Sequence, residues 1–432
     1  MHQQTTEPPQ RVRNRLKSVV GGSIGNLIEW YDWYAYSVFA LYFAGSFFPK
    51  EDETAQLLNT AGIFAIGFLM RPVGGWLMGA YADRKGRKAA LTLSVLLMSG
   101  GSFLITIVPD YNQIGIMAPL ILVLARMLQG LSVGGEYGTV ATYLSEIAPA
   151  NQRGFYSSFQ YVSSTLGQLI ALGILMVLQR WVLNPEQLSA WGWRIPFGIG
   201  TLLAFSAIYL RRNLLETESF RHEEVPAKQR GTLRELAKYK KEAATIVGFT
   251  IGLTVAFYTF TAYVQKFLVN TAGFSKNDST LITTLSLIVF MLAQPVFGML
   301  GDRFGRKRMM IVYGVLGVIT TVPLLTALGN TTDIWMATFL VILALLITSI
   351  NTSLSAIIKA ELFPANVRSL GVSLPYSLAV ALFGGTAEYV ALLFKNVGHA
   401  TWFYWYLTAC IAVSLVVSVN MRDPEKYSKL AE

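Results

Sequence analysis

The chain has 432 residues, of which 53% are hydrophobic and only 14% are charged, and its formal net charge is +10. A soluble domain usually carries about 25% charged residues, so this composition excludes a disordered chain and disfavours a soluble enzyme. One cysteine, Cys410, and three histidines exclude an internal disulfide and disfavour a zinc or haem site.

Apolar stretches long enough to cross a bilayer follow one another along the chain. A transmembrane helix needs about 20 predominantly apolar residues, and on this basis we predict twelve spans. In chain order these are 18–46, 57–81, 89–108, 117–146, 154–180, 192–211, 243–268, 279–300, 309–329, 334–361, 369–394 and 400–421. We expect residues 1–17 to form a basic tail that leads into the first span without a cleavable signal peptide.

Polar residues follow one side of the first span. Asn26, Glu29 and Asp32 are spaced by three residues, which places them along one side of a helix. Glu29 falls near the middle of the span, where loss of hydration favours the neutral form of a carboxylate. We therefore assign proton coupling to Glu29 or Asp32. The alternative is a permanent ion pair with an arginine that only fixes helix packing.

Two arginines lie within the second and fourth spans, where an unpaired charge is costly. The guanidinium of Arg126 can hold a carboxylate through two hydrogen bonds, so we expect it to bind an anionic substrate, or to pair with Glu29 or Asp32 and exchange that partner for substrate. Arg71 is expected to do the same, unless it lies near the end of its span and braces the next loop. Two buried arginines suit a dianion better than a zwitterion.

Other small and polar residues within the spans have separate expected roles. Glycines at 130, 134 and 138 are four residues apart, which predicts close packing against a neighbouring helix. Glu136 is expected to form an inner salt bridge. Lys359 is expected near the cytoplasmic end of its span in a gate network, with substrate binding as the alternative.

Two motifs occur twice at nearly one spacing. Residues 79–88 and 298–307 both read Gly-x-x-x-Asp-Arg-x-Gly-Arg-Lys, with Asp83 and Asp302 219 residues apart. Residues 146–153 repeat in 361–368, at a spacing of 215. This duplication predicts two six-helix halves at 18–211 and 241–422, a cytoplasmic linker at 212–240 and a cytoplasmic tail at 423–432.

The basic residues are distributed unevenly between the predicted loops. With the N-terminus inside, 26 of the 35 lysines and arginines fall on the inner side, six fall on the outer side and three lie within spans. Because cytoplasmic loops collect lysine and arginine, both termini are predicted to be cytoplasmic. This distribution also explains the positive net charge without nucleic acid as a partner.

The doubled loop motif resembles the major facilitator superfamily over essentially the whole chain. Stretches 25–32, 67–72, 126–136 and 191–197 are similar to its metabolite:proton symporter branch, and stretches 257–273 and 383–390 resemble the α-ketoglutarate permeases of that branch. The resemblance implies an all-α membrane protein with 12 transmembrane helices in two pseudo-symmetric six-helix bundles. It also implies that the loop charges act as gates that stabilise the outward-open state. We expect these gating residues to be Asp83, Arg84, Arg87, Glu146, Arg153, Asp302, Arg303, Arg306, Glu361 and Arg368.

The resemblance implies a secondary active transporter rather than an enzyme, with no catalytic residues. The expected function is proton-coupled uptake of α-ketoglutarate or a related dicarboxylate by alternating access, with Arg71, Arg126, Gln129 and Tyr258 binding the substrate. Citrate, shikimate, β-ketoadipate and proline or betaine are alternative substrates. About 11 residues follow Met421, too few for the C-terminal coiled coil of osmosensing carriers. We expect a monomer in the bacterial inner membrane, with protons as coupling ion and no cofactor or metal.

Overall fold

The computed structural model describes residues 9–48, 53–211, 216–221, 226 and 229–430, and these contain helices and no strand. The first half contains α1 (Pro9–Phe47), α2 (Glu53–Lys85), α3 (Arg87–Ile107), α5 (Met117–Ile147), α6 (Arg153–Val177) and α8 (Arg194–Arg211). Short helices α4 (Tyr111–Ile114) and α7 (Pro185–Gln187) lie in its loops. Each of the first six predicted spans coincides with one of the long helices.

The second half repeats this arrangement with two interrupted helices. It contains α11 (Lys240–Tyr258), α12 (Val264–Asn270), α13 (Lys276–Phe304), α14 (Arg306–Asn330), α15 (Ile334–Glu361), α16 (Arg368–Ala379), α17 (Ala387–Asn396) and α18 (Thr401–Asn420). Between the halves, α9 (Glu218–Arg221) and α10 (Leu233–Leu236) lie in the predicted linker. Parts of the predicted tails and linker, at 1–8, 212–215, 222–225, 227–228 and 431–432, lie outside the described residues.

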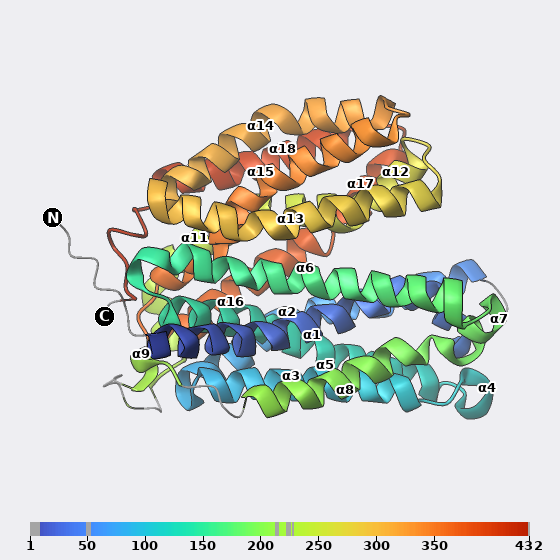
Figure 1. Ribbon diagram of the computed structural model, residues 1–432, viewed down its shortest axis with the longest axis horizontal. Coiled ribbons are helices and arrows are strands. Elements are labelled where there is room, and N and C mark those ends of the chain that lie inside the picture. Colours follow the sequence, from blue (N-terminus) through green and yellow to red (C-terminus); the bar gives the residue numbers. More distant parts are fainter. Residues whose placement is uncertain (1–8, 49–52, 212–215, 222–225, 227–228, 431–432) are drawn as a thin grey trace.

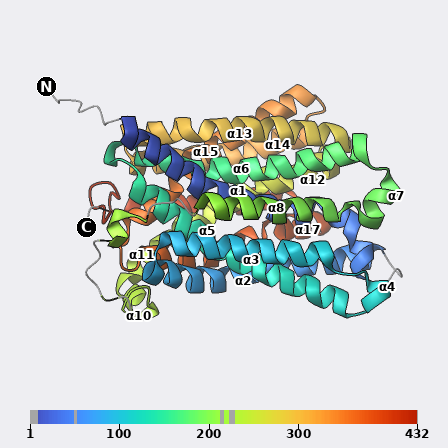
Figure 2. The same cartoon turned by 60° about the horizontal axis from the view of Figure 1, so that its bottom comes forward.

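In the described part of the chain, nine helices are long and apolar enough to cross a membrane. The long helices run side by side, and both chain ends lie at the same end of the molecule (Figure 1). We call this the termini end. Loops with α4 and α7 lie at the opposite end in both views (Figures 1 and 2).

The two halves meet mainly along two helix pairs, α2 against α16 and α6 against α13, with further contacts of α5 with α16 and of α6 with α15. The repeated loop motif makes the same turn in each half. Gly86 separates α2 from α3 with a φ of 102°, and Gly305 separates α13 from α14 with a φ of 93°. A residue with a side chain rarely adopts such positive φ values, which explains why both copies of the motif have glycine there.

The seventh and eleventh predicted spans are not continuous α-helices. A π-helical turn, Thr259–Tyr263, separates α11 from α12, and a second one, Val380–Gly384, lies between α16 and α17. Such turns insert an extra residue into a helix and are frequent at functional sites. They follow directly after Tyr258 and shortly after Tyr376, two residues at the centre of the contact between the halves.

Candidate substrate site and gates

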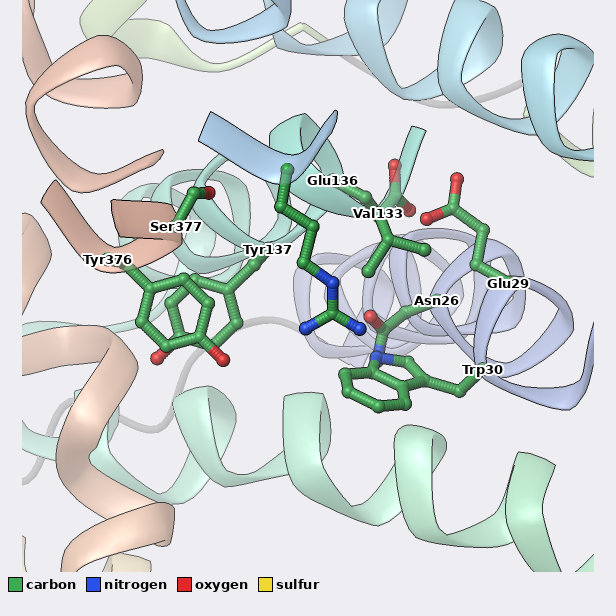
Figure 3. A pocket seen from close by; sticks show the side chains of 9 residues that line it. Asn26, Glu29, Trp30, Val133, Glu136, Tyr137, Tyr376 and Ser377 are labelled. Atoms are coloured by element: carbon green, nitrogen blue, oxygen red, sulfur yellow. The ribbon is translucent and has the colours of Figure 1, made fainter. Parts of the chain in front are cut away.

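A small cavity lies between the two halves and is lined by both. Its lining residues come from four helices (Figure 3): Asn26, Glu29 and Trp30 of α1, Arg71 of α2, Val133, Glu136 and Tyr137 of α5, and Tyr376 and Ser377 of α16. Glu29, predicted to carry the proton, and Arg71, predicted to bind the substrate, both line this cavity.

Arg71 is the cation of this cavity and is 2% exposed. Its Nη1 donates a hydrogen bond to the Tyr258 hydroxyl at 2.9 Å, so the structure brings together two of the predicted substrate ligands from opposite halves. The guanidinium also lies 4.3 Å from the ring centroids of Trp33 and Phe68, which stabilises it as a cation. Among the described residues, its Nε and Nη2 have no hydrogen-bond partner. These donors are suited to an anion.

Close helix packing sets the position of Arg71. A Cβ atom at Gly134 would lie 2.1 Å from the Arg71 carbonyl oxygen, and one at Gly130 would lie 2.4 Å from the Gly67 carbonyl oxygen. Only glycine allows α5 to approach α2 this closely, which confirms the predicted packing role of the glycine stripe. The Ser377 hydroxyl donates to the Gly134 carbonyl at 2.9 Å and connects α16 to the same place.

Arg126 lies in a separate buried cluster that does not line the cavity. Its Nη1 donates to Gln129 Oε1 at 2.6 Å, and Gln129 Nε2 donates to the Ser102 hydroxyl at 3.0 Å. The Arg126 guanidinium lies 4.2 Å from the ring centroid of Trp33. Because Trp33 also contacts Arg71, one indole ring connects this cluster to the cavity arginine. Gln129 thus orients Arg126, although both were predicted as direct substrate ligands.

The two candidate proton-coupling carboxylates have different surroundings. Glu29 lines the cavity, and its Oε1 accepts a hydrogen bond of 2.6 Å from the Ser132 hydroxyl. Asp32 is fully buried near the charge of Arg126, and among the described residues its carboxylate oxygens have no hydrogen-bond partner. The site therefore pairs each buried carboxylate with one arginine region: Glu29 with the cavity of Arg71, and Asp32 with the cluster of Arg126.

At the termini end, the first candidate gate, made of Asp83, Arg87, Glu146 and Arg368, joins α2 of the first half to α16 of the second. Asp83 accepts hydrogen bonds from the backbone N–H groups of Ser369 at 3.0 Å and Leu370 at 2.9 Å, at the start of α16. Arg87 lies 3.3 Å from Asp83 and 3.1 Å from Glu146, and Arg368 lies 2.6 Å from Glu146. The side chains of all four of these charged residues are buried.

The second candidate gate, made of Asp302, Arg306, Glu361 and Arg153, has the same geometry with the halves exchanged. Asp302 accepts hydrogen bonds from the N–H groups of Gly154 at 2.7 Å and Phe155 at 2.9 Å, at the start of α6. Arg306 pairs with Asp302 and Glu361, and Arg153 lies 4.0 Å from Glu361. In both gates a carboxylate binds the N-terminus of a helix of the other half, where the helix dipole favours negative charge.

Two predicted gating residues lie outside these networks in the described part of the chain. Arg84 is exposed and donates to the Arg230 carbonyl at 2.9 Å, and Arg303 is exposed and lies 5.6 Å from the Phe304 ring. The C-terminal tail, in contrast, packs on the gates. The Ser428 hydroxyl donates to Glu361 at 3.2 Å, and Arg368 donates to the Lys429 carbonyl at 2.6 Å.

Sequence reasoning missed the aromatic contact between the halves. The rings of Tyr137, from α5, and Tyr376, from α16, stack with their centroids 3.5 Å apart (Figure 3). They lie on one side of the cavity, and Asn26 and Glu29 lie on the other (Figure 3). No spacing pattern pairs residues 239 positions apart. The sequence offered one indication of this contact: Tyr137 is a polar residue next to Glu136, within the stretch of glycines at 130–138.

The comparisons agree with this architecture. The family model of the Major Facilitator Superfamily matches residues 22–373 and 245–431. The chain is 50% identical over 418 residues to the alpha-ketoglutarate permease of Escherichia coli (strain K12), covering 97% of this chain and 96% of that protein. It is 37% identical to the citrate-proton symporter of Klebsiella pneumoniae, with 92% and 90% covered.

A solved structure of the proton:xylose symporter XylE bound to 6-bromo-6-deoxy-D-glucose has the same fold. It superposes with a TM-score of 0.77 at 17% identity, covering 94% of this chain and 95% of that one. The predicted fold class is confirmed, and these relatives are transporters rather than enzymes. The chain belongs to the major facilitator superfamily.

Proposed function

We propose that this transporter imports α-ketoglutarate, or a closely related dicarboxylate, together with protons. The observation that carries the proposal is Arg71, a buried cation on a cavity between the halves with two N–H donor positions directed at no described residue. A carboxylate matches these donors in charge and shape. The 50% identity to a permease of α-ketoglutarate supports the same substrate.

Proton coupling follows from the charge of such a substrate. Moving one charge through a membrane potential of 100 mV costs about 2.3 kcal/mol, so a dianion entering an inside-negative cell costs about twice that. Protons carried with the substrate remove this cost and add the energy of the pH gradient. The coupling ion is thus the proton, and no cofactor takes part.

Glu29 is the carboxylate best placed to carry the proton. It lines the cavity, where the substrate and a proton can both reach it, and the Ser132 hydroxyl stabilises its charged form by donating a hydrogen bond. Asp32 lies deeper and balances the charge of Arg126. In this mechanism substrate binds at Arg71 when Glu29 is protonated, so that the loaded cavity holds less net charge.

Alternating access uses the two gates. The excess of basic residues on the side of the termini supports a bacterial inner-membrane protein with both termini in the cytoplasm. In that orientation the gates close the cytoplasmic end, and their ion pairs break when the halves rock to release substrate. One chain contains the cavity and both gates, which supports a monomer as the working unit.

The test is uptake of labelled α-ketoglutarate into proteoliposomes with an acidic exterior. Succinate, citrate, shikimate, β-ketoadipate and proline serve as competitors. Accumulation above equilibrium that a protonophore abolishes, and that dicarboxylates inhibit, is the expected result. Uptake that stops at equilibrium contradicts symport, and accumulation of another competitor with no uptake of α-ketoglutarate contradicts the substrate.

A further inference from the structure

The gating charges and the site charges differ in one respect: the gates are duplicated and the site is not. Asp83 and Glu146 recur as Asp302 and Glu361 at offsets of 219 and 215 residues. The same offsets place Phe290 opposite Arg71 and Val341 opposite Arg126. Charges needed to open and close a symmetric pair of gates occur in both halves. Charges that occur once serve something asymmetric, and a bound substrate is asymmetric.

Among the described side chains of the second half, Lys359 on α15 is the buried charge of this unduplicated kind. Its counterpart at the offset of 215 residues is Leu144, and its own exposed fraction is 0%. No carboxylate of the described residues lies within ion-pair distance of its amino group, although the sequence prediction placed it in a gate network. A buried cation without a counter-ion is costly, so its presence at this position indicates a function.

Lys359 reaches the contact between the halves at the edge of the cavity. Its Nζ donates hydrogen bonds to the Tyr137 hydroxyl at 2.9 Å and to the Ser355 hydroxyl at 2.7 Å. The same atom lies 4.3 Å from the ring centroid of Tyr376. Tyr137 and Tyr376 both line the cavity that contains Arg71. The stacked pair of Tyr137 and Tyr376 therefore separates Lys359 from the cavity, and its amino group contacts the hydroxyl of Tyr137.

We propose that Lys359 binds the second carboxylate of a dicarboxylate whose first carboxylate is held by Arg71. This inference rests on the proposed function and deepens it by naming the ligand of each end of the substrate. The incoming carboxylate replaces the Tyr137 hydroxyl as the partner of Nζ, when Tyr137 and Tyr376 slide apart. It supplies the counter-charge that the described residues around Lys359 do not provide.

Binding at both ends couples the substrate to the gates. Arg71 belongs to the first half and Lys359 to the second, so a dicarboxylate joins the halves across the cavity, whereas a monocarboxylate holds one half only. Lys359 is two residues from Glu361, which pairs with Arg306 and Arg153 in the second gate. A shift of α15 on binding therefore reaches that gate directly.

The experiment measures equilibrium binding by calorimetry with the full-length purified protein, so that it does not depend on transport. The ligands are α-ketoglutarate and 2-oxopentanoate, which keeps the keto acid and has a methyl group in place of the second carboxylate. The measured quantity is the ratio of the two Kd values in wild type, Lys359→Met, Lys359→Arg and Lys395→Met. Lys395 is the matched control, because it donates to the Asn270 carbonyl within the second half, away from the cavity.

In Lys359→Met we expect binding of α-ketoglutarate to weaken about tenfold or more, because a hydrogen bond to a charged group is lost. Binding of 2-oxopentanoate should stay within about twofold, so the ratio collapses. Lys359→Arg should retain most of the discrimination, and Lys395→Met should retain all of it. A merely structural role of Lys359 would weaken both ligands equally.

Three results would contradict these inferences, the first two the role of Lys359 and the third the proposed function. A folded Lys359→Met protein, with a wild-type melting temperature and an unchanged Kd ratio, overturns the role of Lys359. An equal loss of both ligands overturns it as well. A wild-type protein that binds no dicarboxylate overturns the proposed function itself, and the two failures are thus separable.

Discussion

The contact of Asp83 with the start of α16 offers a direct test of the gates. The Asp83→Asn substitution keeps the size of the side chain and one acceptor oxygen. It removes the charge that favours the helix N-terminus, one of the two hydrogen bonds to Ser369 and Leu370, and the ion pair with Arg87. Arg87 retains Glu146 as a partner.

The size of the effect follows from these losses. A hydrogen bond to a charged group contributes about 1.5–3 kcal/mol, and a charge at a helix N-terminus contributes about 0.3–1 kcal/mol. We expect the closed state of the termini end to lose about 2–3 kcal/mol in total. Because 1.4 kcal/mol is a tenfold change, the ratio of closed to open molecules should fall about 30- to 150-fold.

The assay is electron–electron double resonance between spin labels placed on the two halves at the termini end. Exposed positions Lys85, at the end of α2, and Arg308, in the first turn of α14, provide the labelling sites. Cys410 is buried and does not compete for the label. Wild type should show one main short distance, and Asp83→Asn should add a population at longer distance.

Two further variants complete the design. Asp302→Asn should give the same shift, because Asp302 makes the equivalent contacts with α6. Asp110→Asn removes the ion pair of 2.6 Å with Arg194 within the first half, near α4, and should leave the distance distribution unchanged. An Asp83→Asn distribution identical to wild type would refute the argument that this carboxylate holds the termini end closed.

Three further predictions concern the site and its packing. Glu29→Gln should abolish accumulation driven by a pH gradient and preserve exchange of labelled for unlabelled substrate; retained accumulation removes Glu29 from coupling. Arg126→Lys keeps the charge but loses the planar guanidinium that bonds Gln129 and lies against Trp33, the ring that also contacts Arg71; calorimetry should therefore show about fivefold weaker α-ketoglutarate binding, and an unchanged Kd counts against a role in the site. Gly134→Ala forces a Cβ to within 2.1 Å of the Arg71 carbonyl, so thermal melting should show a loss of about 1–3 kcal/mol, whereas Gly100→Ala, with nothing within 4 Å, should melt like wild type.

The amino-acid sequence alone determined the parts of this protein that depend on local composition. The predicted spans follow from apolar length, since a helix in lipid must satisfy its own backbone hydrogen bonds. The two halves follow from motif repetition, and the resemblance to the family indicated the candidate gate residues. Asp83 and Arg87 are four residues apart on either side of the turn at Gly86, and Asp302 and Arg306 are four residues apart on either side of the turn at Gly305. The packing role of the glycine stripe was visible in its four-residue steps.

Only the tertiary structure decided which polar residues share a cavity. The sequence treated Arg71 and Arg126 as equivalent, but Arg71 lines the cavity and Arg126 is held behind Trp33 by Gln129. Arg84 and Arg303 belong to the same motif as the gate residues, yet both face outward from the gates. Successive side chains on a helix point about 100° apart, so adjacent residues of one motif can face different surroundings. The motif alone does not tell which of them face the other half.

The partners of Lys359 were equally out of reach of the sequence. Its contact with Tyr137 joins residues 222 positions apart, and the Arg71–Tyr258 bond joins residues 187 positions apart. A helix buried within a bundle is apolar on most of its sides, so its periodicity does not reveal which side faces which neighbour. That choice depends on how the helices pack, and the packing places Arg71 on the cavity and Lys359 behind the tyrosine pair that lines it.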